Sequence, residues 1–162
     1  MKRLLILRHA KSSWADSSQD DWHRPLNPRG LRDAPRVGEW LRERAVMPDI
    51  IITSDAVRAR TTAQAVADAA GYPRDIVANP SLYHAKPDDL LDALNGVSEE
   101  AVTVLIVGHN PGLEDFVLLL TGEHHGLVTA ALVELDLPID RWSDLDGTVA
   151  ASIVETWQPS DG

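Results

Sequence analysis

Three short, strongly apolar segments constrain the fold of this chain more than any other feature of its sequence. They are residues 4–7 (Leu-Leu-Ile-Leu), residues 50–52 (Ile-Ile-Ile) and residues 101–107. A strand buried on both faces of a sheet has this pattern, whereas a half-buried strand alternates apolar and polar residues. Strands of this kind are typical of parallel sheets covered by helices, so the three segments indicate an α/β protein.

Helical patterns separate these strands along the chain. The sequence predicts strands at residues 3–7, 49–53, 75–78, 101–107, 129–136 and 148–157, and helices at residues 28–41, 56–70, 87–95 and 111–121. This alternation predicts a three-layer α/β/α sandwich with a mostly parallel mixed sheet. A length of 162 residues suits one domain with a substantial core, so we expect a single domain over residues 1–162.

Several residues predict where the helices begin. Asn27 and Asn110 are each followed by proline, which places an N-cap before a proline at the first helical position. Ser54 is a candidate N-cap for the helix that follows the second apolar segment. Pro35 lies inside the first predicted helix and is expected to kink or divide it.

The composition excludes several classes of function. The formal net charge is −10, and both nucleic acids and anionic membranes favour basic partners, so neither is expected as the main partner. The chain has no cysteine, which excludes disulfides, thiolate metal sites and a thiol nucleophile. No stretch approaches the ~18 apolar residues of a membrane span, and we expect a cytoplasmic protein.

Polar residues follow each of the three apolar segments. Arg8 and His9 come after the first segment, and Ser54 comes after the second. Arg58 lies one helical turn beyond Ser54, and His109 comes just after the third segment. Open α/β sheets place their ligands at the carboxyl ends of the strands, so we expect these side chains to meet. Two guanidinium groups, two imidazoles and a helix N-terminus suit a dianion such as phosphate.

Histidine beside phosphate predicts phosphoryl transfer as well as binding. A neutral imidazole can attack phosphorus and carry the phosphoryl group covalently. The second histidine and the arginines can stabilise charge on the transferring oxygens, a task that other enzymes give to a metal ion. No carboxylate cluster with metal-ligand spacing accompanies these histidines, and no glycine-rich nucleotide loop occurs in the sequence. We therefore expect neither a metal nor another cofactor.

The motifs at these positions resemble those of the histidine phosphatase (phosphoglycerate mutase-like) superfamily. Residues 7–10 resemble its R-H-G signature, residues 54–63 its S-x-x-x-R-A-x-x-T-A motif, and residues 108–110 its second-histidine motif. Residues 8–14, 24–26, 30, 82–83 and 108–114 are similar to the SixA-type phosphohistidine phosphatases within it. The resemblance implies a phosphoglycerate mutase-like fold. It also implies that His9 is the nucleophile and that Arg8, Arg58 and His109 bind the phosphoryl group.

A long loop is predicted over residues 10–26, and it borders the expected site. Lys11, Ser13 and Arg24 either contact the substrate there or are solvated loop residues. Trp14 lies on the same loop and is expected to border the pocket. Long ordered loops in compact domains tend to be functional.

Two departures from the superfamily bear on the substrate. Ala15 stands where the mutase-like branch has an asparagine, and Asn110 stands where the acid phosphatase branch has a proton-donating aspartate. The donor glutamate of the mutases also has no clear counterpart, and His84 is the nearest titratable residue. An alkoxide leaving group needs a proton, whereas phosphohistidine can enter with its ring already protonated. The missing acid therefore favours a phosphohistidine substrate.

We predict a metal-independent phosphatase that acts on phosphohistidine in a phosphorylated protein. One alternative is an enzyme of the same superfamily that hydrolyses small phosphate esters, and a mutase is a weaker one. Another alternative is a non-catalytic module that binds phosphate or reads phosphohistidine. Arg58 offers a simpler reading too, because it can pair with Asp55 or Asp68 on its own helix.

Overall fold

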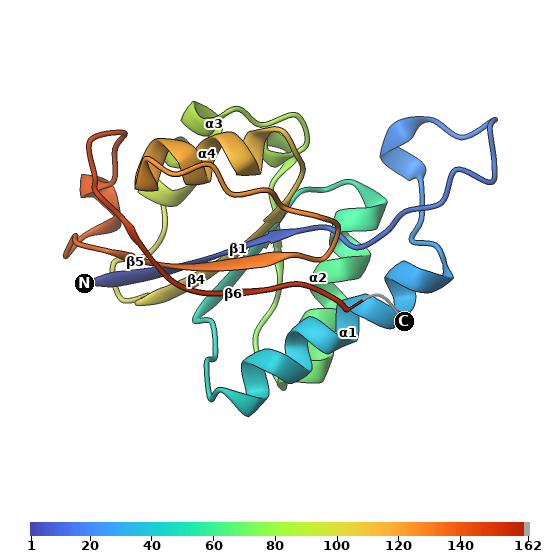
Figure 1. The fold of residues 1–162 in the computed structure, drawn as a ribbon, viewed down its shortest axis with the longest axis horizontal. Coiled ribbons are helices and arrows are strands. Elements are labelled where there is room, and N and C mark those ends of the chain that lie inside the picture. Colours follow the sequence, from blue (N-terminus) through green and yellow to red (C-terminus); the bar gives the residue numbers. More distant parts are fainter. Residues whose placement is uncertain (161–162) are drawn as a thin grey trace.

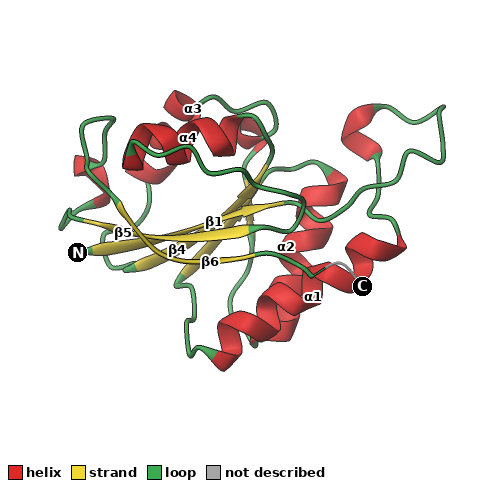
Figure 2. Ribbon diagram, viewed as in Figure 1, coloured by secondary structure: helices red, strands yellow, loops and turns green. Residues whose placement is uncertain are grey.

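The computed structural model describes residues 1–160 and contains a six-stranded mixed sheet with helices on both faces (Figure 1, Figure 2). The strands are β1 (Lys2–Arg8), β2 (Ile50–Thr53), β3 (Val77–Ala78), β4 (Thr103–Gly108), β5 (Leu132–Leu137) and β6 (Ser152–Trp157). The helices are α1 (Pro28–Glu43), α2 (Val57–Ala70), α3 (Pro87–Asn95) and α4 (Gly112–Thr121), with short 3-10 helices η1 (Asp21–His23), η2 (Pro80–Leu82) and η3 (Trp142–Asp144). The predicted three-layer sandwich is confirmed, and the last two residues of the predicted domain, 161–162, lie outside the described residues.

Strand β1 lies inside the sheet, whose order is β3-β2-β4-β1-β5-β6. It pairs in parallel with β4 and antiparallel with β5, while β2 pairs in parallel with β4. In this register Arg8 lies opposite Gly108, and Thr53 lies opposite Val107. The residues that follow β1, β2 and β4 therefore emerge at the same edge of the sheet, as the sequence predicts.

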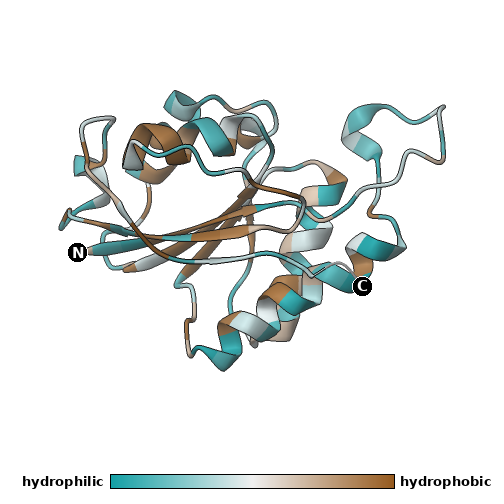
Figure 3. Ribbon diagram, in the orientation of Figure 1, coloured by the Kyte–Doolittle hydropathy of each residue, from teal (hydrophilic) through white to brown (hydrophobic). Residues whose placement is uncertain are grey.

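Alternate residues of β1 point into two separate cores. Leu4 and Ile6 pack with residues of α3 and α4, whereas Leu5 and Leu7 pack with residues of α1 and α2. All four side chains are fully buried, and burying each contributes about 1.5–3 kcal/mol. Figure 3 shows this apolar character along the central strands. Packing on both faces holds the carboxyl end of β1 in place.

Helix α1 runs through Pro35 without a break, so the predicted division there is wrong. Asn27 caps the helix as predicted, because its side chain accepts a hydrogen bond from the backbone N–H of Gly30 at 2.9 Å. Proline removes the N–H that would bond the carbonyl of Leu31, and Leu31 is 57% exposed, so water can satisfy that carbonyl. Helix α1 has 16 residues. Within residues 1–160, no helix is both long enough and apolar enough to cross a membrane.

Two other helices begin later than predicted. Helix α2 starts at Val57, and the Ser54 hydroxyl accepts from the backbone N–H of Ala56 in the preceding turn instead of capping the helix. Helix α4 starts at Gly112, so Asn110 is not its N-cap. The Asn110 amide donates to the carbonyl oxygen of Leu127 at 2.8 Å. In both places the polar side chain predicted to cap the helix instead forms a hydrogen bond with another backbone group near the edge of the sheet.

The connection at residues 10–26 lies beside this edge of the sheet (Figure 1). Ser12 and Leu26 form an isolated antiparallel bridge that joins its two ends. Gly30 sits so close to it that a Cβ atom there would lie 2.1 Å from the carbonyl oxygen of Lys11, which only glycine allows. The loop is thus anchored on the first turn of α1, with η1 at its far end.

Candidate active site

A cavity of about 210 Å³ lies at the carboxyl edge of the sheet. Its lining consists of Arg8, His9, Lys11, Ser12, Trp14, Arg24, Arg58, His109, Asn110 and Thr129. The four residues predicted to bind and attack a phosphoryl group all face this one cavity, and Lys11 and Arg24 join them. They come from the ends of β1 and β4, from the first turn of α2 and from the loop at residues 10–26.

Ser12, rather than the predicted Ser13, lines the cavity. Side chains alternate along an extended chain, and Ser12 is the residue that bridges to Leu26. The Ser12 hydroxyl accepts a hydrogen bond from Nη1 of Arg24 at 2.7 Å. The Ser13 hydroxyl instead accepts from the backbone N–H of Ala15 at 3.1 Å. The structure therefore does not bring Ser13 to the other predicted site residues.

Trp14 and Arg24 form one side of the cavity together. The guanidinium carbon of Arg24 lies 3.5 Å from the centre of the Trp14 ring, a cation–π stack. The Arg24 side chain is only 9% exposed. Trp14 therefore borders the site, in agreement with its predicted place.

His9 is buried and fixed through the backbone on both sides. Its own N–H donates to the carbonyl of Gly108 at 3.1 Å, and the N–H of Ala10 donates to Oγ1 of Thr62 at 3.0 Å. Nδ1 of His9 lies 2.7 Å from the carbonyl oxygen of Ala10. Since that oxygen can only accept, Nδ1 carries the proton and Nε2 keeps its lone pair. Nε2 is thus the nitrogen available for attack.

Both cavity histidines have pKa values far below the ordinary value of 6.5. Burial lowers the pKa of His9 to about 4, with Arg58 and Arg8 adding to the effect against the hydrogen bond to Ala10. Burial, followed by His9 and Arg58, lowers the pKa of His109 to about 3. Both imidazoles are therefore neutral at pH 7 in the free protein. A bound dianion would favour the protonated form of His109.

His109 stands between His9 and Tyr83. Its ring centre lies 5.1 Å from that of His9 and 5.6 Å from that of Tyr83, which meets it edge-on. Nε2 of His109 lies 2.8 Å from the Ser54 hydroxyl oxygen. That hydroxyl can donate to Nε2, which leaves the proton on Nδ1 as a donor for an anionic oxygen.

Four buried polar atoms of the cavity lining have no hydrogen-bond partner within residues 1–160. They are Nε of Arg8, Nε of Arg58, Nδ1 of His109 and Oδ1 of Asn110. Buried polar groups in proteins are almost always bonded, so their concentration at one cavity indicates a polar ligand. Arginine donors and an imidazole N–H suit the oxygens of a phosphoryl group. Over the same residues no group of three or more His, Cys, Asp or Glu side chains is placed to hold a metal ion.

Asp21, in η1, is a site residue that the sequence analysis does not single out. Its Oδ2 atom lies 2.9 Å from Nη2 of Arg58 and accepts from the Tyr83 hydroxyl at 2.6 Å. Its Oδ1 atom lies 3.1 Å from Nε and 3.0 Å from Nη2 of Arg24. One carboxylate thus joins two of the arginines that line the cavity.

This pairing settles the alternative reading of Arg58. In the part of the chain described, its ion-pair partner is Asp21 rather than Asp55 or Asp68. Burial would raise the pKa of Asp21, but hydrogen bonds from Tyr83 and Arg58 outweigh it and hold that pKa well below its ordinary range. Burial and the hydrogen bond to Asp21 raise the pKa of Tyr83 to about 12. The sequence gives little signal for this contact, because Asp21 is one of several acidic residues in its loop.

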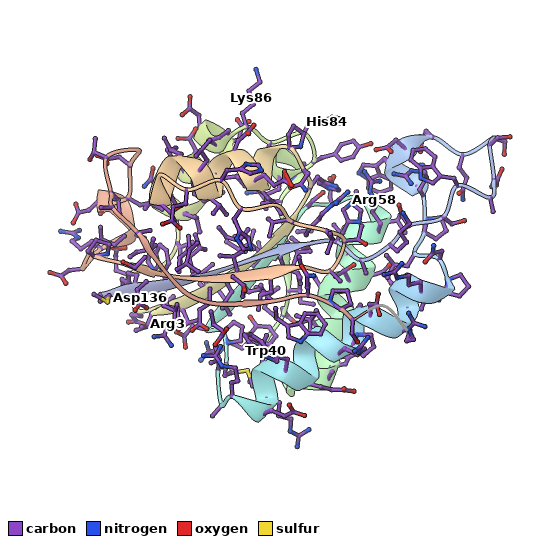
Figure 4. All side chains as sticks on the ribbon, viewed as in Figure 1. Arg3, Trp40, Arg58, His84, Lys86 and Asp136 are labelled. Atoms are coloured by element: carbon purple, nitrogen blue, oxygen red, sulfur yellow. The ribbon has the colours of Figure 1, made fainter. Side chains whose placement is uncertain are left out.

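A second cavity of about 350 Å³ adjoins the first. Its lining consists of Arg58, Tyr83, His84, Ala85, Lys86, His109, Asn110, Pro111, Gly112 and Asp115. His84 is exposed, and its ring centre lies 4.0 Å from that of Tyr83. Figure 4 shows His84 and Lys86 beside each other above Arg58, with Lys86 pointing outward. The shared residues make this cavity a continuation of the first on the side away from His9.

Comparison with known proteins defines the family. Residues 4–83 match the model of the histidine phosphatase superfamily (branch 1). An uncharacterized protein of Mycobacterium leprae is 31% identical over 155 residues, which are 94% of this chain and 90% of that protein. The chain therefore belongs to the histidine phosphatase superfamily.

Solved structures of similar sequence extend the match to the whole fold. A candidate phosphohistidine phosphatase SixA from Agrobacterium tumefaciens is 29% identical, with a TM-score of 0.83 and 98% of both chains covered. A second one, from Nakamurella multipartitia, is 26% identical, with a TM-score of 0.86 and 99% and 97% coverage. The superfamily and these neighbours support a phosphatase with a phosphoglycerate mutase-like fold.

Proposed function

We propose that this chain is a metal-independent protein phosphohistidine phosphatase that works through a covalent phosphohistidine on His9. The observation that carries the proposal is the hydrogen bond from Nδ1 of His9 to the carbonyl of Ala10, at 2.7 Å. It fixes the tautomer that leaves Nε2 unprotonated, in a cavity that Arg8, Arg58 and His109 also line. A fixed and neutral imidazole beside buried cations suits nucleophilic attack on phosphorus.

The proposed reaction has two balanced steps. Nε2 of His9 attacks phosphorus, and the P–N bond of the substrate breaks as its imidazole, protonated on the other nitrogen, leaves with the electron pair. The carbonyl of Ala10 then stabilises the proton on Nδ1 of phosphorylated His9. Water next attacks phosphorus, the electron pair of the broken P–N bond returns to Nε2, and the proton of the water passes to solvent. Arg8, Arg58 and His109 stabilise the charge on the phosphoryl oxygens in both steps.

The surroundings of the leaving group favour a P–N bond over a P–O bond. The Asn110 side chain is neutral, and its amide donates to the Leu127 carbonyl. His84 is exposed, and its ring packs beside that of Tyr83. An imidazole leaving group needs no such acid, whereas an alkoxide does. Hydrolysis of small phosphate esters remains the second candidate, because the adjoining cavity is larger than an imidazole ring.

A comparison of substrates tests this proposal. We expect a higher kcat/KM on a phosphohistidine-bearing protein than on any of a panel of alkyl phosphate monoesters, measured with the same enzyme preparation. An aryl phosphate, which has a good leaving group, should also be hydrolysed. Equal or faster turnover of sugar phosphates would favour the small-ester reading, and absence of turnover on every substrate would leave only a binding module.

The low pKa of His9 predicts activity at acidic pH. The reaction needs neutral His9, and its pKa of about 4 lies below the ordinary 6.5, so the nucleophile stays unprotonated as the pH falls through 6 and 5. The acid limb of the pH profile of kcat/KM should therefore lie near pH 4, after the profile is corrected for the separately measured titration of the substrate. A limb centred near pH 6.5 would contradict the low pKa, and an NMR titration of the His9 ring checks it directly.

A further inference from the structure

We infer that Asp21 is a positioning residue of this phosphatase, which holds Arg24 and Arg58 for the transferring phosphoryl group and limits the affinity of the cavity for phosphate. This inference rests on the proposed function. It adds a residue that belongs neither to the sequence motifs nor to the ends of the strands. Asp21 belongs to the loop at residues 10–26 and does not itself line the cavity. It acts through the two arginines that do.

Asp21 contacts two of the three guanidinium nitrogens of each arginine. Its carboxylate and its backbone carbonyl bind Nη2 and Nη1 of Arg58 at 2.9 and 2.7 Å. Oδ1 binds Nε and Nη2 of Arg24, whose remaining Nη1 donates to Ser12. The two guanidinium side chains are 6% and 9% exposed, whereas that of Asp21 is 43% exposed. Two buried cations therefore depend on one carboxylate at the rim of the site.

This arrangement decides which edge of Arg58 faces the cavity. Both Nη atoms are bonded to Asp21, and Nε is the buried donor that lacks a partner within the described chain. Arginine can bind phosphate through a two-pronged fork, but here most of the fork is turned to Asp21. Without the carboxylate, Nη2 would lose its partner while Nη1 keeps its bond to the backbone carbonyl of Asp21, so the guanidinium could turn Nη2 toward the phosphate.

The carboxylate also offsets part of the positive charge around the cavity. Arg8, Lys11, Arg24 and Arg58 all line it, and inorganic phosphate is both the product and a dianion. Binding that is equally strong for product and transition state adds nothing to turnover. The negative charge of Asp21 beside two of these cations lowers the affinity of the cavity for free phosphate. We therefore expect Asp21 to help product release as well as positioning.

A matched pair of aspartates on one loop tests the inference. Asp21→Asn should lower kcat on an aryl phosphate by about 10- to 100-fold, because Arg58 loses the charged bond from Nη2 that helps to orient it. The same variant should bind inorganic phosphate at least about threefold more tightly in calorimetry, because a nearby negative charge is gone. Asp16→Asn removes the same charge from an exposed side chain whose contacts are with Ser18, and it should leave both quantities unchanged.

Three results would overturn the inference. They are an unchanged kcat in Asp21→Asn, phosphate affinity that is unchanged or weaker, and equal effects in the two variants. A purely structural role for Asp21 would lower the melting temperature without tightening phosphate binding. Calorimetry does not depend on turnover, so a wild-type protein without phosphatase activity would refute the proposed function, while the phosphate affinities would still decide the role of Asp21.

Tyr83→Phe provides a second variant in case Asp21→Asn does not fold. It removes the hydroxyl that donates to Oδ2 of Asp21 and leaves the charge of the carboxylate in place. We expect kcat to fall severalfold and phosphate affinity to stay at the wild-type value. Unchanged kcat, or tighter phosphate binding in this variant, would count against a positioning carboxylate.

Discussion

His9→Ala is expected to lower phosphatase turnover by at least about 10⁴-fold, because it removes the atom to which the phosphoryl group is transferred. The other imidazole of the lining, that of His109, does not replace it, because its Nε2 lies against the Ser54 hydroxyl. The measurement is kcat on an aryl phosphate, together with trapping of the phosphorylated protein in acid-free conditions. The wild-type protein should carry one phosphoryl group on His9, and the variant should carry none.

Two controls separate loss of the nucleophile from loss of the fold. His124→Ala removes an imidazole from an exposed position outside the cavity and should leave turnover unchanged. His9→Ala should still bind tungstate, a tetrahedral oxyanion, because Arg8 and Arg58 remain. Turnover within tenfold of wild type in His9→Ala, or a phosphoryl group trapped on another residue, would refute the proposed nucleophile.

The strand ends were predictable from sequence because backbone geometry alone determines where they lie. Residues 4–7 and 104–107 are apolar throughout, which indicates burial on both faces and hence a parallel sheet under helices. Parallel pairing then places Arg8 opposite Gly108. His9 and His109, the next residues along the chain, therefore lie at the same edge of the sheet. Local pattern and sheet register were enough to bring the two histidines together.

Side-chain pairing across long loops was not predictable in the same way. Asp21 and Arg58 are 37 positions apart, and no periodicity relates a 3-10 turn in a loop to the first turn of a helix. The choice of Ser12 over Ser13 depends on a single isolated bridge to Leu26, and a shift of one residue would reverse it. Pro35 does not divide α1, because the missing N–H leaves only the carbonyl of Leu31, an exposed residue, without its helical bond.

Arg58→Ala is expected to lower kcat/KM by about 10³-fold, which corresponds to roughly 4 kcal/mol of transition-state stabilisation. The variant loses a buried cation at the phosphoryl site and also leaves the Asp21 carboxylate without its partner from α2. Arg58→Lys keeps the positive charge but cannot bond Asp21 through two nitrogens and still present a third donor, so it should recover only part of the loss. Steady-state kinetics on an aryl phosphate measures both variants.

Arg60→Ala is the matched control, because Arg60 lies two residues further along α2 and is exposed. Its Nε donates to the carbonyl of Asp55, and its guanidinium lies over the Trp22 ring at 5.2 Å, away from the cavity lining. We expect kcat/KM of this variant to stay within about twofold of wild type, because an exposed charge outside the cavity lining contributes little to binding or catalysis there. Equal losses in Arg58→Ala and Arg60→Ala would mean that the net charge of α2, and not the placement of one guanidinium beside His9, governs the reaction.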